Sequence, residues 1–302
     1  MAIFKKLLRF VQKKKLFKEW STEYIEFVKT KSLKAKTLSE IERHVFLLDK
    51  EFGELTLTEI TPLHIAQLIN QIIEKGHAVT AKRVLHRARD CFNLAILYGH
   101  INHNPATPID APVIQISRKR MTYDEFLKLK DNTPPHSPWV PLLLDLALVT
   151  AQRRADLIKM QFSDVRNEHL HITQQKTGAR IALPLDLRLD AANLELGGVI
   201  ERCKKYGSVE SDYLLRKSNG EPLSADYVSS LFGKIRTWAE ISGDSERPNP
   251  PTLHEIRSLS ERMYREQGIN TQILLGHKSR SMTDMYNDDR GLTKDAIKYL
   301  VL

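Results

Sequence analysis

Apolar residues recur at helical spacing along the first part of the chain. Over residues 18–104 they fall three and four positions apart, as on the buried face of amphipathic helices. Thr37 and Glu40 have the spacing of a capping box, and Thr61-Pro62 has the residue types preferred at an N-cap and at the first helical position. The pattern predicts a compact block of four helices, the last over about 79–99.

Prolines break this periodicity between two parts of the chain. Residues 105–120 contain several prolines, sustain no apolar repeat and end in the basic run Ser117-Arg118-Lys119-Arg120. This composition is typical of a linker between domains. We therefore expect a helical domain over residues 17–104, a linker over 105–120 and a second folded unit over 121–302.

The second unit mixes helical and strand patterns. Thr122 and Glu125 again have capping-box spacing, and residues 140–149 are apolar enough for a buried helix. Residues 169–173 and 180–184 alternate like strands, and a hairpin turn is expected between them. Further helices are expected near residues 192–205, 224–241, 253–266 and 269–275. The predicted fold class is mainly α with a small antiparallel sheet (α+β).

Composition narrows the class of protein. The chain has 302 residues, of which 41% are hydrophobic and 27% charged, as in a globular protein of two ordinary domains. Its two cysteines lie far apart in sequence, which excludes a disulfide scaffold or a cysteine-built metal site and fits a reducing cytoplasm. No apolar run approaches the roughly 20 residues of a membrane span, so no membrane partner is expected.

A net charge of +9 suggests a polyanionic partner. Residues 1–16 form a short basic segment without the unbroken apolar stretch of a signal peptide. A basic stripe on the last helix of the first domain could contact DNA phosphates, although a solvated helix face has the same pattern. The candidate DNA-binding residues are Lys82, Arg83, Arg87, Arg118, Lys119 and Arg120.

Several polar side chains of the second unit could do chemistry, but each also has an ordinary structural explanation. Arg153 and Asp156 follow the predicted buried helix, where an ion pair at a helix start is common. Lys176 lies in the predicted turn, where lysines are usually exposed. His277 is expected in a turn, and Tyr286, nine residues later, has the surroundings of a half-buried surface tyrosine.

A further segment is expected to begin a helix. Thr252 and Glu255 have capping-box spacing, which places His254 and Arg257 in its first turns. Because these two residues are three positions apart, they project from one face of the helix. An imidazole and a guanidinium at the positive end of a helix make a good anion site.

In combination these residue types suit phosphodiester transfer. Arginine forks grip phosphate oxygens bidentately and keep their charge. A tyrosine can attack phosphorus and store the bond energy in a phosphotyrosyl ester, while histidines and a lysine move protons. The sequence has no carboxylate cluster of the kind that holds two metal ions in nucleases. We therefore expect a reaction that needs neither a metal nor a cofactor.

The same segments resemble the motifs of the tyrosine recombinase (phage integrase) family, above all its lambda-type members. The resemblance extends from about residue 17 to Gly291, over the core-binding and catalytic domains of that family. Ala151 stands where the family usually has glycine, a small change that we expect to be tolerated. The matching segments are Thr150 to Leu157, Gln175-Lys176-Thr177-Gly178, His254 to Arg257, Leu274 to His277, and Tyr286 within Tyr-Asn-Asp-Asp-Arg-Gly.

The resemblance implies a role for each catalytic candidate. Arg153 and Arg257 would clamp the scissile phosphate, and Asp156 would orient Arg153. Tyr286 would be the nucleophile that forms a 3′-phosphotyrosyl bond. The proton-moving candidates are His254 at the tyrosine, Lys176 at the 5′-hydroxyl leaving group, and His277 as a donor to the phosphate.

The resemblance also implies an assembly. A homotetramer would exchange strands of double-stranded DNA at attachment core sites through a Holliday junction, each protomer closing on DNA as a C-shaped clamp. DNA-bending accessory proteins and an excisionase are further partners of such enzymes. The expected protein is a phage or prophage integrase in the cytoplasm of a bacterial host, on the nucleoid.

Some alternatives stay open. Lambda-type integrases carry an arm-binding domain, whereas about 16 residues precede the core-binding domain here, so the arm domain is either missing or dispensed with. The apolar tail after Gly291 could pack on a neighbouring protomer or on its own domain. A DNA-binding protein without catalysis, a type IB topoisomerase and a resolvase of chromosome dimers are the rival functions.

Overall fold

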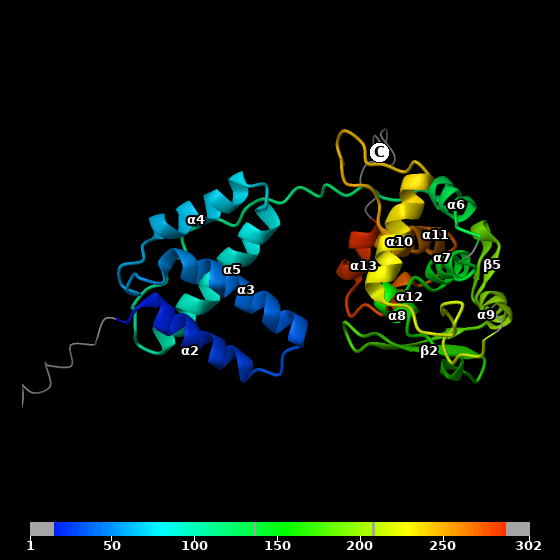
Figure 1. The fold of residues 1–302 in the computed structure, drawn as a ribbon, viewed down its shortest axis with the longest axis horizontal. Helices are drawn as coiled ribbons and strands as arrows, with labels where there is room; N and C mark the ends of the chain where they lie inside the picture. The colour runs from blue at the N-terminus through cyan, green and yellow to red at the C-terminus, as the bar shows by residue number, and fades with distance from the viewer. Residues whose placement is uncertain (1–14, 136, 207–208, 288–302) are drawn as a thin grey trace, which may run out of the picture. The chain divides into compact units, whose positions relative to one another are not determined.

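A computed structural model describes residues 15–135, 137–206 and 209–287. These residues form two compact units, one ending at Gln115 and the other beginning at Ile116 (Figure 1). Most of the predicted basic segment 1–16 and the tail after Gly291 lie outside the described residues. Among the helices of the described part, none is both long and apolar enough to cross a membrane.

The first unit is the predicted block of four helices. They are α2 (Phe17–Lys29), α3 (Ala35–Phe52), α4 (Pro62–Glu74) and α5 (Ala78–Leu97). Helix α5 packs against the other three (Figure 1). Its buried face carries alanine and larger apolar side chains at helical spacing. Trp20 of α2 anchors the packing, because its buried indole donates to the carbonyl of Cys91 on α5 at 3.2 Å.

One of the two predicted helix starts in this unit is confirmed. Thr61 caps α4, with its hydroxyl accepting from the backbone of His64 and Pro62 at the first helical position. The predicted capping box at Thr37 and Glu40 is wrong, because α3 already begins at Ala35. Alanine and lysine are good helix formers, so the helix extends upstream of Thr37. Glu40 instead faces Arg83 of α5 at 4.0 Å.

The predicted linker, residues 105–120, is bonded to a folded unit at each of its ends. At its start, Ala106 is fully buried in the first unit, and Arg89 donates to its carbonyl at 3.2 Å. At its end, Ser117 and Lys119 exchange backbone hydrogen bonds with Asn249, each at 3.0 Å. The basic run 117–120 is therefore part of the second unit.

The second unit is mainly helical, with two small antiparallel sheets, which confirms the predicted fold class. Three strands within residues 165–184 pair in chain order, with His171 opposite Ala182, and two short strands within residues 188–195 pair with each other. The helices are α6 (Tyr123–Asp131), α7 (Trp139–Thr150), α8 (Arg154–Leu157), α9 (Leu196–Lys205), α10 (Ala225–Trp238), α11 (Leu253–Glu266), α12 (Thr271–Leu275) and α13 (Arg280–Asn287). The strands and short 3-10 turns are η1 (Phe162–Asp164), β1 (Val165–Arg166), β2 (His169–Thr173), β3 (Arg180–Pro184), β4 (Arg188–Leu189), η2 (Asp190–Ala192) and β5 (Leu194–Glu195).

Helix α7 is the centre of this unit, as its apolar sequence predicts. It packs against α9 and α11, and almost all of its residues are buried (Figure 1). Its one charged residue, Asp145, is completely buried and forms ion pairs with Lys130 at 2.6 Å and Arg202 at 2.9 Å. The helix ends at Ala151, whose φ of +54° explains why glycine suits this position.

Candidate active site

Tyr286 lies on α13 among side chains from two other parts of the unit, helix α11 and the turn after α12. Its hydroxyl is 3.2 Å from Nε2 of His254, at the start of α11. The ring centroid of His277, in the turn after α12, is 5.3 Å from that of Tyr286. The guanidinium of Arg257 lies 5.5 Å from the Tyr286 ring centroid. The structure therefore brings together four of the six catalytic candidates around one phenol.

Arg257 is rigidly held, with only 1% of its side chain surface exposed. Its guanidinium donates to the carbonyl of Ala151 and, at 2.7 Å, to that of Leu275. Burial, followed by the positive charge of Arg153, lowers the pKa of Arg257 to about 10. The group stays charged at neutral pH, and a phosphate would relieve the repulsion between the two arginines.

The buried ring of His277 has a defined tautomer. Its Nε2 lies 3.2 Å from Nη2 of Arg257, and its Nδ1 lies 2.9 Å from the Thr283 hydroxyl. Because arginine can only donate, Nε2 must accept, and Nδ1 carries the proton. Burial and then the charges of Arg257 and Arg153 lower the pKa of His277 to about 4. In this arrangement His277 accepts a hydrogen bond, and donation to a phosphate requires Nε2 to be protonated.

His254 is placed to take a proton from Tyr286. Its side chain is open to solvent on one side, but neighbouring protein atoms displace much of the water around the ring. This desolvation, followed by the charges of Arg257 and Arg153, lowers the pKa of His254 to about 4. The imidazole is therefore neutral at pH 7, as a general base must be.

Arg153 and Lys176 complete the set of catalytic candidates. Arg153 caps α8 and donates to Oε1 of Gln174 at 2.8 Å. Lys176 is exposed in the turn between β2 and β3, and its charge also contributes to lowering the pKa of His254. The turn is the predicted one, and it places the lysine near enough for its charge to act on His254.

The side chain of Asp156 has a different hydrogen-bond partner from the one expected. Its Oδ1 accepts from the backbone nitrogen of Gln175 at 2.8 Å, so the carboxylate holds the turn that carries Lys176. The expected orientation of Arg153 by Asp156 is therefore replaced by a hydrogen bond from Arg153 to Gln174. The physical reason is that the turn after β2 brings the backbone nitrogen of Gln175 within hydrogen-bonding distance of the Asp156 carboxylate.

The backbone of α13, the helix that carries Tyr286, is tied to the rest of the unit. Ser258 of α11 donates to the Tyr286 carbonyl at 2.8 Å. Arg120 donates to the Met285 carbonyl at 2.6 Å and pairs with Glu255 at 2.9 Å, both side chains being 3% exposed. Contrary to the expectation from the sequence, Arg120 is thus buried and not available to a DNA phosphate.

The same contact explains why α11 lacks the predicted capping box. Glu255 turns inward to Arg120 rather than back to the backbone of Thr252. Thr252 is still the N-cap residue, and its hydroxyl accepts from Arg118 at 3.3 Å. Arg118 is exposed beside His254, whereas Lys119 pairs with Glu125 at 2.9 Å.

A cationic cleft extends from the candidate active site. Arg153 and His254 line it together with Arg154, Arg236 and Ser229. Arg154 donates to the Ser229 hydroxyl, and Arg236 donates to the Pro251 carbonyl at 3.1 Å. Neither of these two arginines was a candidate from the sequence, and Ser229, the partner of Arg154, lies 75 residues further along the chain.

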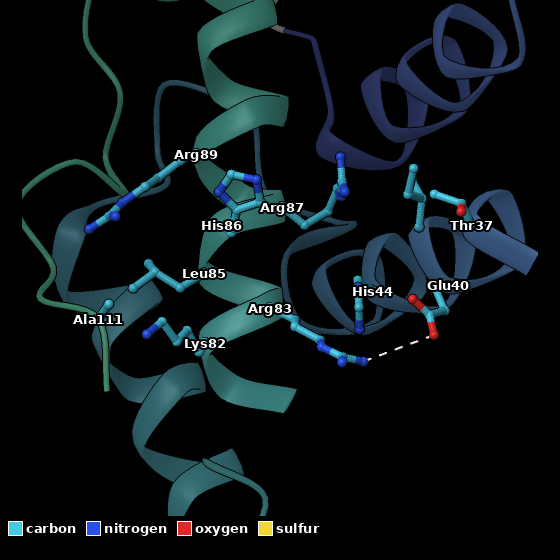
Figure 2. A pocket seen from close by; sticks show the side chains of 11 residues that line it. Thr37, Glu40, His44, Lys82, Arg83, Leu85, His86, Arg87, Arg89 and Ala111 are labelled. Atoms are coloured by element: carbon cyan, nitrogen blue, oxygen red, sulfur yellow. Dashed lines mark ion pairs between the residues drawn. The ribbon is translucent and has the colours of Figure 1, made fainter. Parts of the chain in front are cut away.

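The first unit has a basic pocket of its own between α3 and α5 (Figure 2). Lys82 and Arg83 are exposed there. Arg87 is half-buried and donates to the Tyr24 hydroxyl at 2.8 Å and to Asp90 at 3.1 Å, so it stabilises the helix packing. Lys82 and Arg83 stay candidates for DNA contact, whereas the existing partners of Arg87 make it a weaker one.

Comparisons with known proteins agree with this site. The model of the phage integrase family matches residues 119–291, and that of the phage integrase central domain matches residues 17–111. The integrase of Escherichia phage HK022 is 35% identical over 281 residues, which cover 92% of this chain and 77% of the relative.

Two solved structures of lambda integrase are also similar. One is a dimer of residues 75–356 bound to a COC′ core site, with a TM-score of 0.87, 33% identity, and coverage of 93% of this chain and 99% of that one. The other is a tetramer bound to a Holliday junction, with a TM-score of 0.86, 32% identity, and coverage of 96% and 81%. With its motif residues gathered around Tyr286, the chain belongs to the phage integrase family of tyrosine recombinases.

Proposed function

We propose that this site-specific recombinase integrates a phage or prophage genome by cutting and rejoining DNA at attachment core sites through Tyr286. One observation carries the proposal. The Tyr286 hydroxyl lies 3.2 Å from a neutral His254 and beside the buried guanidinium of Arg257. A phenol, a base and an anion-binding group are thus assembled at one point, as an attack on a phosphodiester requires.

In the proposed cleavage step, the phosphodiester is transferred from the 5′-oxygen of DNA to the phenol of Tyr286. The Tyr286 oxygen forms a bond to phosphorus while the bond from phosphorus to the 5′-oxygen breaks. The phenol proton passes to Nε2 of His254, and Lys176 gives a proton to the departing 5′-oxygen. Arg153 and Arg257 hold the non-bridging oxygens, whose negative charge grows in the transition state. Rejoining is the reverse reaction with a 5′-hydroxyl from another strand.

The related structures support an assembly for this chain. Lambda integrase is described as a dimer on a core site and as a tetramer on a Holliday junction. By extension, four copies of this chain exchange strands in two rounds on double-stranded DNA, on the nucleoid of the host. The C-shaped clamp, accessory proteins and an excisionase stay predictions.

DNA phosphates are the proposed ligands of two basic surfaces. In the second unit the cleft beside Arg153 offers Arg154 and Arg236, with Arg118 next to it. In the first unit Lys82 and Arg83 are exposed. Each phosphate contact releases a counterion, so the affinity for DNA should fall steeply as the salt concentration rises.

A plasmid assay tests the function and separates it from topoisomerase activity. The protein is incubated in EDTA with supercoiled DNA that carries two candidate attachment sites. Recombinant products that depend on both sites support the proposal. Relaxed DNA without recombinants favours a type IB topoisomerase, and a strict requirement for magnesium contradicts the proposed chemistry.

A further inference from the structure

Gln174 is a buried amide at the end of β2 that no motif of the sequence singled out. It is 1% exposed. Its Oε1 accepts from Arg153 at 2.8 Å and from the Thr177 hydroxyl at 2.8 Å. Its Nε2 donates to Oε1 of Gln152 and to the Leu275 carbonyl, both at 2.9 Å. Both donors and both acceptor positions of the amide are therefore used.

This arrangement permits one orientation of the amide. If the group were flipped, its NH₂ would face the donors of Arg153 and Thr177, and its oxygen would face the Leu275 carbonyl. Gln152 is fixed in the same way, because its Nε2 donates to the carbonyls of Thr150 at 2.8 Å and Leu274 at 2.9 Å. The ends of α7 and α12 thus determine where the Gln174 oxygen points.

Gln174 connects the three cationic groups of the site. It contacts Arg153 directly, and it shares the Leu275 carbonyl with Arg257, which donates there at 2.7 Å. Through Thr177 it also holds the turn that carries Lys176. A shift of this one amide would therefore move both the phosphate-binding arginines and the proposed general acid.

Gly276 leaves room for the side-chain amide of Gln174, because glycine has no Cβ. Gly276 has a φ of +63°, and a Cβ there would lie 3.0 Å from Nε2 of Gln174. Glycine at the end of α12 thus serves the backbone turn and the close approach of the amide at the same time. The contact joins β2 to the turn that carries His277.

We propose that Gln174 is a positioning residue for strand cleavage. Its amide acts mainly by holding Arg153 toward the scissile phosphate, and its contact with Thr177 gives the turn of Lys176 secondary support. The inference rests on the proposed function, because it takes Arg153 to be a ligand of that phosphate. A misplacement of about 1 Å in such a site costs roughly 100-fold in rate, so the loss of the amide should be easy to measure.

The test uses Gln174→Leu, which keeps the approximate shape and removes the amide. Cleavage is measured in a single turnover on a nicked suicide substrate at saturating protein, and DNA affinity is measured separately. We expect a rate lower by roughly 10- to 100-fold with an affinity changed less than about threefold. Gln267→Leu is the matched control, since its exposed amide bridges Asp190 and Arg188 away from the site, and its cleavage rate should equal that of the wild type.

A double-mutant cycle with Arg153→Lys tells positioning from a general structural role. If Gln174 acts through Arg153, Gln174→Leu should slow the Arg153→Lys protein by less than about threefold. An equal loss in both backgrounds would overturn the inference. So would a wild-type cleavage rate in Gln174→Leu, or a loss of DNA affinity as large as the loss of rate.

A second variant and a measurement on the wild type distinguish a failure of this inference from a failure of the protein to fold or of the proposed function. If Gln174→Leu melts well below the wild type, Gln174→Glu replaces it. The carboxylate keeps the shape but competes with the phosphate for Arg153, so cleavage should again be lost while DNA binding remains. Wild-type protein that forms no covalent complex on a bound core site would count against the proposed function itself. Normal wild-type cleavage with an unaffected Gln174 variant would count against this inference alone.

Discussion

The two arginines proposed to bind the scissile phosphate are anchored in different ways. Arg257 is buried and donates to two backbone carbonyls, which fixes its guanidinium relative to α7 and α12. Arg153 is partly exposed and depends on the side chain of Gln174. Both arginines place their positive charge near His254, since each lowers the pKa of that histidine.

Replacing either arginine should stop cleavage without preventing DNA binding. We expect Arg153→Ala and Arg257→Ala to lower the cleavage rate by at least roughly 10²–10³-fold, as the loss of a transition-state donor does. Affinity should change only slightly, because one phosphate among many is affected. Gel-shift and suicide-substrate assays measure the two quantities, with Arg188→Ala as a surface control. Losses of equal size in binding and cleavage would mean that the arginines are structural.

Among the helices and strands, α7 is followed by a residue with a strained backbone, Ala151. Ala151 has a φ of +54°, where a residue with a Cβ costs about 1–2 kcal/mol relative to glycine. We expect Ala151→Gly to raise the free energy of unfolding by about 0.5–1 kcal/mol, after the greater chain entropy of glycine in the unfolded state is subtracted.

Denaturant unfolding measures this change. Ala147→Gly is the control, because position 147 lies inside α7, where glycine should instead destabilise by about 1 kcal/mol. Destabilisation by both substitutions would show that the backbone at residue 151 is not strained.

The buried pair of Arg120 and Glu255 holds α13, the helix that carries Tyr286. Arg120→Met leaves the Glu255 carboxylate without this partner, and such a loss costs about 3–5 kcal/mol. We expect the melting temperature and the cleavage rate to fall together, because Arg120 also holds the Met285 carbonyl. Lys119→Met breaks the more exposed pair with Glu125 and should cost less than about 1 kcal/mol. Equal effects of the two substitutions would refute the special role of Arg120.

The elements and the residues that gather around Tyr286 could be predicted from the sequence, but many of their contacts could not. Periodicity located the helices, and the motif resemblance selected Tyr286 and its neighbours. The partners of Arg153 and Arg120 depend on chain segments 21 and 135 residues away, which no local pattern specifies. One signal for Gln174 was present, since the alternation of β2 buries Leu170 and Ile172 and places residue 174 on the same inner face.

On the scale of the whole molecule, the burial of His277, together with the nearby charges of Arg257 and Arg153, makes stability depend on pH. His277 has a pKa of about 4 in the folded protein, against an ordinary value of 6.5. As the pH falls from about 6.5 to 4, the unfolded chain therefore binds a proton that the folded protein does not. Stability should fall over this range, with a slope of at most about 1.4 kcal/mol per pH unit for one proton.

Unfolding of the DNA-free protein across this pH range checks the prediction. His277→Gln should show a shallower loss of stability than the wild type, because it removes one of the groups that take up a proton on unfolding. Identical slopes for the two proteins would contradict the assignment of a depressed pKa to His277.

Covalent trapping tests the central claim most directly. The protein is incubated with a nicked suicide substrate that carries a candidate core site, and the products are separated on a denaturing gel beside those of Tyr286→Phe. The claim predicts a DNA-linked band in the wild type that is absent from Tyr286→Phe, although both proteins bind the substrate. A DNA-linked band that persists in Tyr286→Phe would contradict it, because another residue would then be the nucleophile.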